Sequence, residues 1–141
     1  MIEIKWKRLN PEAKQPVKIY KASAGWDVHA AEYVSLQPFF GQVEAKTGIA
    51  MAIPDGHCIF AKDRSGLARR GLHVAAGVFD ADFRGEVIIV LRNSSSEYIK
   101  FHPGDRIAQL LILPVPEVKW VEVDSLDETD RGTNGFGSTG R

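Results

Sequence analysis

Five glycine-rich, polar stretches interrupt an otherwise apolar sequence, and they hold the side chains best suited to chemistry. They are residues 24–30, 64–71, 76–86, 104–109 and 131–140. Arginines and hydroxyls bind phosphate oxygens, glycines allow a close backbone approach, and an ionised carboxylate can take a proton from water. Taken singly, each stretch also fits a turn, a helix cap or a hairpin tip, so the functional interpretation depends on the complete set.

Charge and composition exclude several broad classes of function. The chain has 18 Lys plus Arg and 18 Asp plus Glu, so its formal net charge is zero. This balance argues against binding to nucleic acid or to a membrane surface, but a few arginines can still be focused on one small anion. There is no apolar core of a signal peptide and no apolar run that could cross a membrane. We therefore expect a soluble, intracellular, cytoplasmic protein, with a nuclear or organellar location left open for a eukaryotic source.

The length of 141 residues corresponds to a single domain followed by a short tail of different character. Residues 1–123 are predicted to form the domain, with the lone cysteine, Cys58, as a buried core residue. One cysteine also excludes an internal disulfide and a cysteine-rich zinc site. Residues 124–141 hold too little apolar surface to offset the entropy of ordering, so they are predicted to form a flexible arm. The arm is either a frayed terminus, or its glycines and hydroxyls, with Arg131 and Phe136, fold over a nucleotide.

Apolar and polar residues alternate with a period of two through most of the chain, which predicts β-strands. The predicted strands are residues 2–7, 33–36, 42–53, 57–61, 86–92, 98–101, 106–113 and 118–123. Many short strands separated by turn signals predict an all-β sandwich or barrel. One helix of a turn or two is expected in residues 65–70, with Ser65 as its N-cap.

The order and residues of the five polar stretches resemble the five motifs of the trimeric dUTPase family, the deoxyuridine triphosphate nucleotidohydrolases. The matching residues are Ala24-Gly25-x-Asp27, Arg64-Ser65-Gly66-Leu67-Ala68, Gly77-Val78-x-Asp80-x-Asp82-x-Arg84-Gly85, Gly104-Asp105-Arg106-Ile107-Ala108-Gln109 and Arg131-Gly132-x-x-Gly135-Phe136-Gly137-Ser138-Thr139-Gly140. Each motif is moderately specific, whereas the ordered set, which spans residues 24–140, is highly specific.

This resemblance implies a distorted jelly-roll β-barrel that assembles as a homotrimer, with active sites shared between three chains. It also implies Mg²⁺-dependent hydrolysis of dUTP to dUMP and pyrophosphate, by in-line attack of water on the α-phosphate. Such an activity limits the incorporation of uracil into DNA and supplies dUMP for thymidylate synthesis. The expected partners are therefore dUTP and two further copies of the chain, with no nucleic acid and no membrane.

The family's motifs imply a role for each matching residue of this sequence. Asp80 is the expected catalytic residue, which orients and deprotonates the attacking water and also accepts the 3′-hydroxyl of the sugar. Mg²⁺ is expected to be held by the triphosphate and waters without a direct protein ligand, with Asp27 reaching it through water. The expected substrate-binding residues are Arg64, Ser65 and Gly66 for the phosphate chain, Gln109 for the α-phosphate, Arg131, Ser138 and Thr139 for the γ-phosphate, Gly77, Val78, Phe79 and Ile88 for the base, Phe83 for the sugar, and Phe136 with Gly137 for covering the uracil.

Three departures from the family's usual residues have open consequences. Phe83 replaces a tyrosine and loses the hydroxyl while it keeps the ring. Asp63 stands where proline is frequent and adds a negative charge near the phosphates, where it either weakens binding or tethers Arg64. Asn134 replaces a glycine, a change best tolerated where φ is positive.

Two other functions remain open at this stage. A dCTP deaminase, or a bifunctional dCTP deaminase and dUTPase, shares the barrel, but the complete Gly-Phe-Gly-Ser-Thr arm favours dUTPase. A regulatory protein that kept the fold and binds a partner through its surface is the second alternative. The presence of Asp80, Ser65, Gln109 and Arg131 argues against it, because an inactive descendant would be free to lose them.

Overall fold

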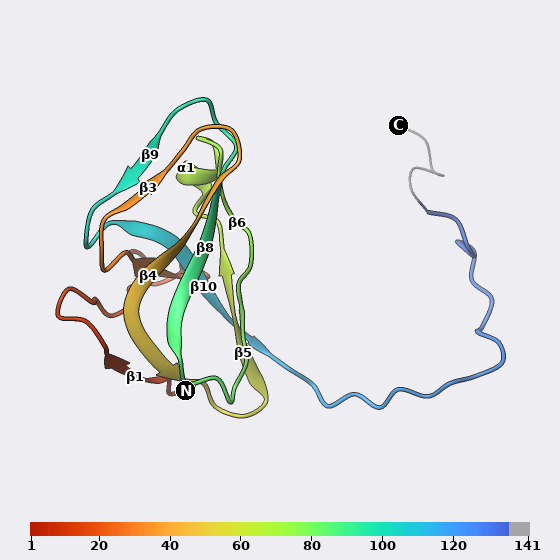
Figure 1. Ribbon diagram of the computed structural model, residues 1–141. Helices are drawn as coiled ribbons and strands as arrows, with labels where there is room; N and C mark the ends of the chain where they lie inside the picture. Colours follow the sequence, from red (N-terminus) through yellow and green to blue (C-terminus); the bar gives the residue numbers. More distant parts are fainter. Residues whose placement is uncertain (136–141) are drawn as a thin grey trace.

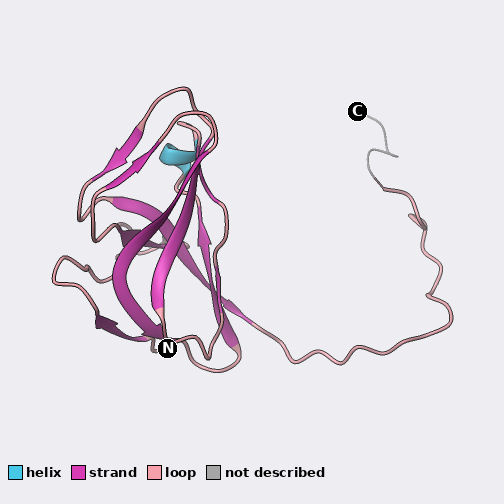
Figure 2. Cartoon of the chain, in the orientation of Figure 1, coloured by secondary structure: helices cyan, strands magenta, loops and turns pink. Residues whose placement is uncertain are grey.

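The computed structural model describes residues 1–135, which form ten strands and one short helix (Figures 1 and 2). The elements are β1 (Lys5–Arg8), β2 (Trp26–His29), β3 (Val34–Leu36), β4 (Gly41–Ala52), β5 (His57–Lys62), α1 (Ser65–Ala68), β6 (Leu72–Val74), β7 (Val78–Phe79), β8 (Glu86–Asn93), β9 (Ile99–Phe101) and β10 (Arg106–Pro114). The predicted all-β, jelly-roll-like fold is confirmed.

Two four-stranded antiparallel sheets carry most of the fold. One has the strand order β1-β4-β8-β6 and the other has the order β2-β10-β5-β7, while β3 and β9 form a small separate pair. Strand β8 shows why the alternation in the sequence becomes a sheet with one buried face. Its residues Val87, Ile89 and Leu91 are buried, and the residues between them are more exposed.

The apolar core is continuous across both sheets. Cys58 is buried, as the sequence predicted. The largest fully buried apolar side chains are Leu36, Ile49, Ile59, Leu72, Ile89, Leu91, Ile107, Val28 and Val87. Within residues 1–135, the single helix is far too short to span a lipid bilayer.

Four details of the predicted secondary structure are wrong. Residues 118–123 form no strand, because no strand within residues 1–135 pairs with them, and Trp120 is 93% exposed. Strand β1 begins only at Lys5, since its pairing with β4 begins there. The short strands β2, β6 and β7 were not predicted, because their glycine-rich surroundings obscure the alternation. Helix α1 has Arg64 as its N-cap, without a side-chain capping hydrogen bond, so Ser65 is the first helical residue and not the cap.

Candidate active site

Asp27 holds two arginines at one end of the β2-β10-β5 sheet. Its Oδ1 accepts a hydrogen bond from Nε of Arg64 at 3.1 Å, and its Oδ2 accepts one from Nη1 of Arg106 at 2.9 Å. Arg64 also donates through Nη1 to the backbone oxygen of Arg106 at 3.1 Å. The Asp27 side chain is only 15% exposed, so both ion pairs are partly shielded from water. Two guanidinium groups share one carboxylate, which leaves this edge positively charged.

Gln109 lies beside these arginines because of the strand register. It is opposite Asp27 of β2 and opposite Lys62 of β5. Its side-chain Nε2 donates to the backbone oxygen of Asp63 at 2.8 Å. A Cβ atom at Gly25 would lie 2.5 Å from Oε1 of Gln109, so a side chain at this position would displace the Gln109 amide. The structure therefore brings Asp27, Arg64 and Gln109 together from three separate motifs.

Ser65 and Gly66 follow Arg64 at the start of α1, and both are exposed. A Cβ atom at Gly66 would meet nothing within 4 Å, so the surface around it is open. The two residues therefore lie next to the arginines, on the open side of the β5–α1 junction. A polyanion bound to Arg64 would come within reach of both residues.

Sequence reasoning missed Lys14, His29 and Arg106 as members of this site. The Lys14 side chain lies against Gly104, whose positive φ of 89° forms the turn before β10. Burial lowers the pKa of His29, and the positive charges of Lys14, Arg106 and Arg64 lower it further, although Asp27 opposes them. Its Nδ1 has no hydrogen-bond partner among the described residues. A correct prediction of strand β2 would have found this histidine, because Asp27 and His29 are two residues apart and share a face.

The β7–β8 connection places the predicted catalytic residue. Strand β7 pairs with β5, where Phe79 is opposite Ile59, and the connection continues past this pair to Asp80. Asp80 is exposed and lines a shallow pocket with His57 and Cys58. The backbone N–H of Phe83 donates to the backbone oxygen of Asp80 at 3.2 Å, which closes the turn.

Arg84 and Phe83 shape the tip of this connection. Nη1 of Arg84 donates to the backbone oxygens of Ala81 at 2.6 Å and Phe83 at 2.9 Å, so the arginine braces its own turn. The Phe83 ring is 42% exposed and lies 6.2 Å, between ring centroids, from the ring of Phe79. It also covers Gly85, where a Cβ atom would clash with it. An exposed aromatic face is therefore held next to Asp80.

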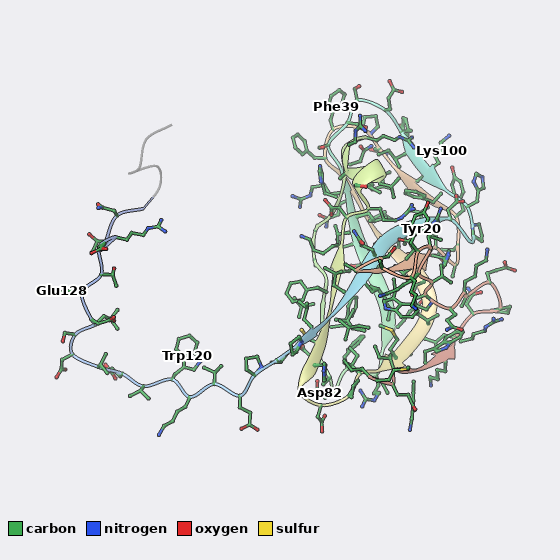
Figure 3. The ribbon with its side chains drawn as sticks, turned by 180° about the vertical axis from the view of Figure 1, so that it is seen from behind. Tyr20, Phe39, Asp82, Lys100, Trp120 and Glu128 are labelled. Carbon is green, nitrogen blue, oxygen red and sulfur yellow. The ribbon has the colours of Figure 1, made fainter. Side chains whose placement is uncertain are left out.

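The two groups of predicted site residues lie at opposite ends of the chain's body. Helix α1 is at the top of Figure 1 and the β7–β8 connection at the bottom, and Figure 3 labels Asp82 at that lower end. Asp80 is beside Cys58, and the extended chain from Cys58 to Arg64 spans roughly 20 Å. A single chain therefore does not bring Asp80 and Phe83 to Arg64 and Gln109. The predicted base-binding residues, Gly77, Val78, Phe79 and Ile88, belong to or flank β7 and β8.

Residues 115–135 form an extended segment that leaves the body after β10 (Figure 3). Arg131 is exposed, and its Nε donates to the backbone oxygen of Asn134 at 2.9 Å. Asn134 does not have a positive φ, since Phe39 and Phe40 are the non-glycine residues that do within residues 1–135. The predicted binding residues Phe136, Gly137, Ser138 and Thr139 lie outside the described part of the chain.

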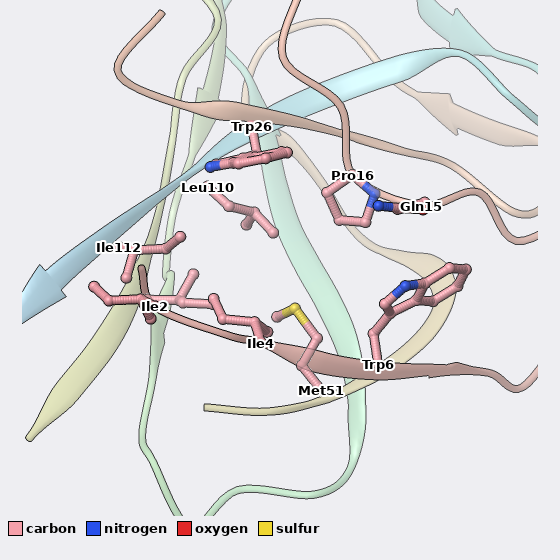
Figure 4. A pocket seen from close by; sticks show the side chains of 10 residues that line it. Ile2, Ile4, Trp6, Gln15, Pro16, Trp26, Met51, Leu110 and Ile112 are labelled. Carbon is pink, nitrogen blue, oxygen red and sulfur yellow. The ribbon is translucent and has the colours of Figure 1, made fainter. Parts of the chain in front are cut away.

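A separate apolar pocket lies between β1 and the β2-β10-β5 sheet (Figure 4). Its lining is almost entirely hydrophobic, and Trp26 faces into it from β2. Gln15 is its one polar side chain, and no charged residue lines it. This pocket is therefore unsuited to a triphosphate, in contrast to the edge that carries the arginines.

The described residues contain no cluster of three or more His, Cys, Asp or Glu side chains that could hold a metal ion. Both oxygens of Asp27 already accept hydrogen bonds from arginines. Each oxygen retains a second lone pair, so a contact through water is compatible with this geometry. The donor set therefore fits a Mg²⁺ ion that brings most of its ligands with it as phosphate oxygens and waters.

The fold and this edge define an all-β protein with a cationic edge that suits a small polyanion. The dUTPase family model matches residues 11–140. A deoxyuridine 5′-triphosphate nucleotidohydrolase of Zymomonas mobilis is 46% identical over 144 aligned residues, which cover 99% of this chain and 98% of the relative. The chain therefore belongs to the dUTPase family.

Solved structures agree with this assignment. The dUTPase of Staphylococcus bacteriophage 80alpha, solved with dUPNHPP, matches with a TM-score of 0.90 and 27% identity, over 99% of each chain. A dUTPase from phage phi11 of S. aureus matches with a TM-score of 0.80 and 25% identity, over 87% of this chain and 97% of the other. The second structure was used to describe the coordination of a structural Mg(II) ion.

Proposed function

We propose that this protein hydrolyses dUTP to dUMP and pyrophosphate, through in-line attack of water on the α-phosphate. Membership of the dUTPase family supports this proposal. The observation that carries it is the arrangement of Arg64, Arg106 and Gln109 around Asp27, with Lys14 nearby. Donors that are already fixed in place can stabilise the charge that develops during phosphoryl transfer. The reaction removes dUTP that would otherwise bring uracil into DNA, and it supplies dUMP for thymidylate synthesis.

The proposed roles at the phosphates come from the family's motifs, and the positions of Arg64, Ser65, Gly66 and Gln109 around Asp27 support them. Arg64, Ser65 and the backbone of Gly66 contact the phosphate chain, and Gln109 contacts the α-phosphate. Arg131, Ser138 and Thr139 of the arm bind the γ-phosphate. A bound Mg²⁺ ion would neutralise part of the charge on the triphosphate and orient it, held by phosphate oxygens and waters, with Asp27 as a water-mediated contact.

The β7–β8 connection supplies the proposed recognition of base and sugar. Backbone groups of residues 77–79, together with Ile88, pair with uracil and leave buried groups unpaired if cytosine takes its place. Phe83 lies under the deoxyribose and excludes a ribose 2′-hydroxyl, while Phe136 and Gly137 cover the base. The missing tyrosine hydroxyl does not affect this steric exclusion.

Asp80 is the proposed general base. Its exposure at the turn leaves both oxygens accessible to a water molecule and to the 3′-hydroxyl of the sugar. Asp82, two residues further along, is assigned a structural role with Arg84. The distinction between these two exposed carboxylates is the most direct test of the mechanism.

The complete site requires more than one chain, and we propose a homotrimer. Asp80 and Arg64 of one chain lie at opposite ends of its body. The two residues that act on one nucleotide would therefore come from different chains, which supports this assembly. The exposed apolar residues Trp120, Val121 and Val123 support it as well, since they would gain from burial against another copy. The proposed location is the cytoplasm.

The test is pyrophosphate release from dUTP, dCTP and UTP, measured in parallel for the wild type, Asp80→Asn and Asp82→Asn. We expect the wild type to prefer dUTP, and Asp80→Asn to lose on the order of 10²–10⁴-fold in kcat while it still binds dUTP. Asp82→Asn is the matched control and should stay near wild type. Release from dCTP or UTP at the dUTP rate would contradict the proposed specificity, and an active Asp80→Asn would contradict the assigned base.

A further inference from the structure

Ser94, His73 and Asp63 form a chain of hydrogen-bonding side chains near the β5–α1 junction. Oγ of Ser94 lies 3.3 Å from Nε2 of His73, and Nδ1 of His73 lies 3.1 Å from Oδ2 of Asp63. They come from the turn after β8, from β6 and from the residue before Arg64. This order of groups is that of the catalytic triad of serine hydrolases, so it could either activate Ser94 or hold Asp63 in place.

The surroundings of Ser94 argue against a nucleophile. An acyl-transfer site needs free N–H groups for the developing oxyanion. The N–H of Ser94 donates to the backbone oxygen of Gly71 at 2.8 Å, and the N–H of Ser95 donates to Oδ1 of Asn93 at 3.0 Å. The hydroxyl of Ser94 is itself 3.0 Å from the Gly71 oxygen. The donors closest to Ser94 are therefore already occupied.

Asp63, in contrast, links two strands through separate parts of the residue. Its carboxylate binds β6, where Oδ1 accepts the N–H of Val74 at 2.7 Å and Oδ2 lies beside His73. Its backbone oxygen binds β10, where it accepts Nε2 of Gln109 at 2.8 Å. Burial opposes ionisation of Asp63, but the hydrogen bonds from Val74 and His73 and the nearby positive charges lower its pKa overall. The sequence-based alternative in which Asp63 tethers Arg64 is wrong, because Arg64 pairs with Asp27 instead.

We propose that Asp63, braced by His73 and Ser94, is a positioning residue for the phosphate-binding side chains. Through its carboxylate, Asp63 fixes the junction between β5 and α1 against β6. Its backbone oxygen then orients Gln109, and the fixed backbone also positions the next residue, Arg64. The inference rests on the proposed function, since it concerns groups assigned to the triphosphate. Asp63 itself does not touch the substrate.

The test compares Asp63→Ala, Asp63→Asn and His73→Gln with the wild type. Asp63→Ala should lower kcat/KM for dUTP by about tenfold to a hundredfold, mainly through KM, because small displacements of binding groups are costly. Asp63→Asn should recover part of this loss, since its amide oxygen still accepts the N–H of Val74. His73→Gln should give a smaller loss in the same direction. Glu97→Gln, an exposed carboxylate close to Ser94 in sequence, is the control and should stay near wild type.

A second measurement tests whether the Gln109 side chain is held in place, and it does not depend on enzymatic activity. Hydrogen exchange of the Gln109 side-chain amide, followed by NMR in full-length protein, should accelerate about tenfold in Asp63→Ala, because its acceptor is no longer held. Failure of the wild type to release pyrophosphate would refute the proposed function, and the amide exchange would then decide the positioning role alone.

Three results would overturn the positioning role. The first is an Asp63→Ala protein with kcat/KM within about twofold of wild type and unchanged exchange at Gln109. The second is a lower Tm with unchanged KM and exchange, which would make Asp63 a stability residue only. The third is hydrolysis of p-nitrophenyl acetate by the wild type that disappears in Ser94→Ala, because Ser94 would then be the nucleophile of a triad.

Discussion

Replacing Asp27 by asparagine removes the charge that holds two arginines at the proposed phosphate-binding edge. An amide oxygen can still accept from one guanidinium group, but its NH₂ group faces the other and cannot accept a hydrogen bond. Arg64 and Arg106 are 27% and 38% exposed, so water compensates only part of the loss. One charge-assisted hydrogen bond is worth about 1.5–3 kcal/mol, and we expect Asp27→Asn to lower the free energy of unfolding by about 2 kcal/mol.

Thermal denaturation at fixed protein concentration measures this loss. For a chain of this length, about 2 kcal/mol corresponds to a decrease in Tm of roughly 6–8 °C. In the same variant, a loosened Arg64 should lower kcat/KM for dUTP by about thirtyfold, which is the same energy expressed in transition-state binding. Asp105→Asn is the control for stability, because its side chain is 52% exposed and accepts a single backbone hydrogen bond from His102. A Tm within about 1 °C of wild type in Asp27→Asn would refute the reasoning.

Phe83→Ala should raise the rate on UTP relative to dUTP by about tenfold or more, because it removes the ring that we propose excludes the 2′-hydroxyl; an unchanged ratio would place that exclusion elsewhere. Burial lowers the pKa of His29 from its usual 6.5, so near and below that pH the unfolded state binds a proton that the folded state does not. Stability should therefore fall as the pH drops from 7 to 5.5, and His29→Gln should flatten this slope in thermal denaturation; an equal slope would exclude His29 as its source. A chain ended after Asp130 should keep its Tm and lose most of kcat, since residues 131–135 are exposed and carry little apolar surface. Near-normal turnover would make the arm a frayed terminus.

The long strands were predictable because the alternation of apolar and polar residues that indicates them lies within each strand's own sequence. In β8, the alternation of Val87, Ile89 and Leu91 is visible in the sequence and corresponds to one buried face. Strand β2 was not predictable in this way, since Gly25 and Asp27 break its apolar pattern. Its strand character depends on pairing with β10, which lies far away in the sequence. Because β2 was missed, the position of His29 on the face of Asp27 was missed with it.

In the candidate site too, local sequence motifs predicted which residues take part, whereas their contacts depend on residues far apart in the sequence. The motifs identified Arg64 and Gln109 by residue type, but the contact between Gln109 and the backbone oxygen of Asp63 follows from the register of β10 on β5. The engagement of Asp27 by both arginines is likewise a result of tertiary structure. The predicted strand at residues 118–123 is wrong because the local pattern is present but the long-range pairing is not. Their alternation is real, but a strand needs a partner, and residues 1–135 of the same chain provide none.

The separation of Asp80 from the basic residues has a physical consequence in the proposed trimer. A carboxylate placed beside Arg64 in the same chain would pair with it, as Asp27 does, and would compete with the phosphates for that guanidinium. At the far end of the body, Asp80 is beside His57 and Cys58, so it remains available for water. Assembly would then bring the proposed general base, Asp80, near the arginines of another chain, with the triphosphate lying between them. A chain of zero net charge can in this way present a cationic edge, where Asp27 neutralises only part of the charge of Arg64 and Arg106.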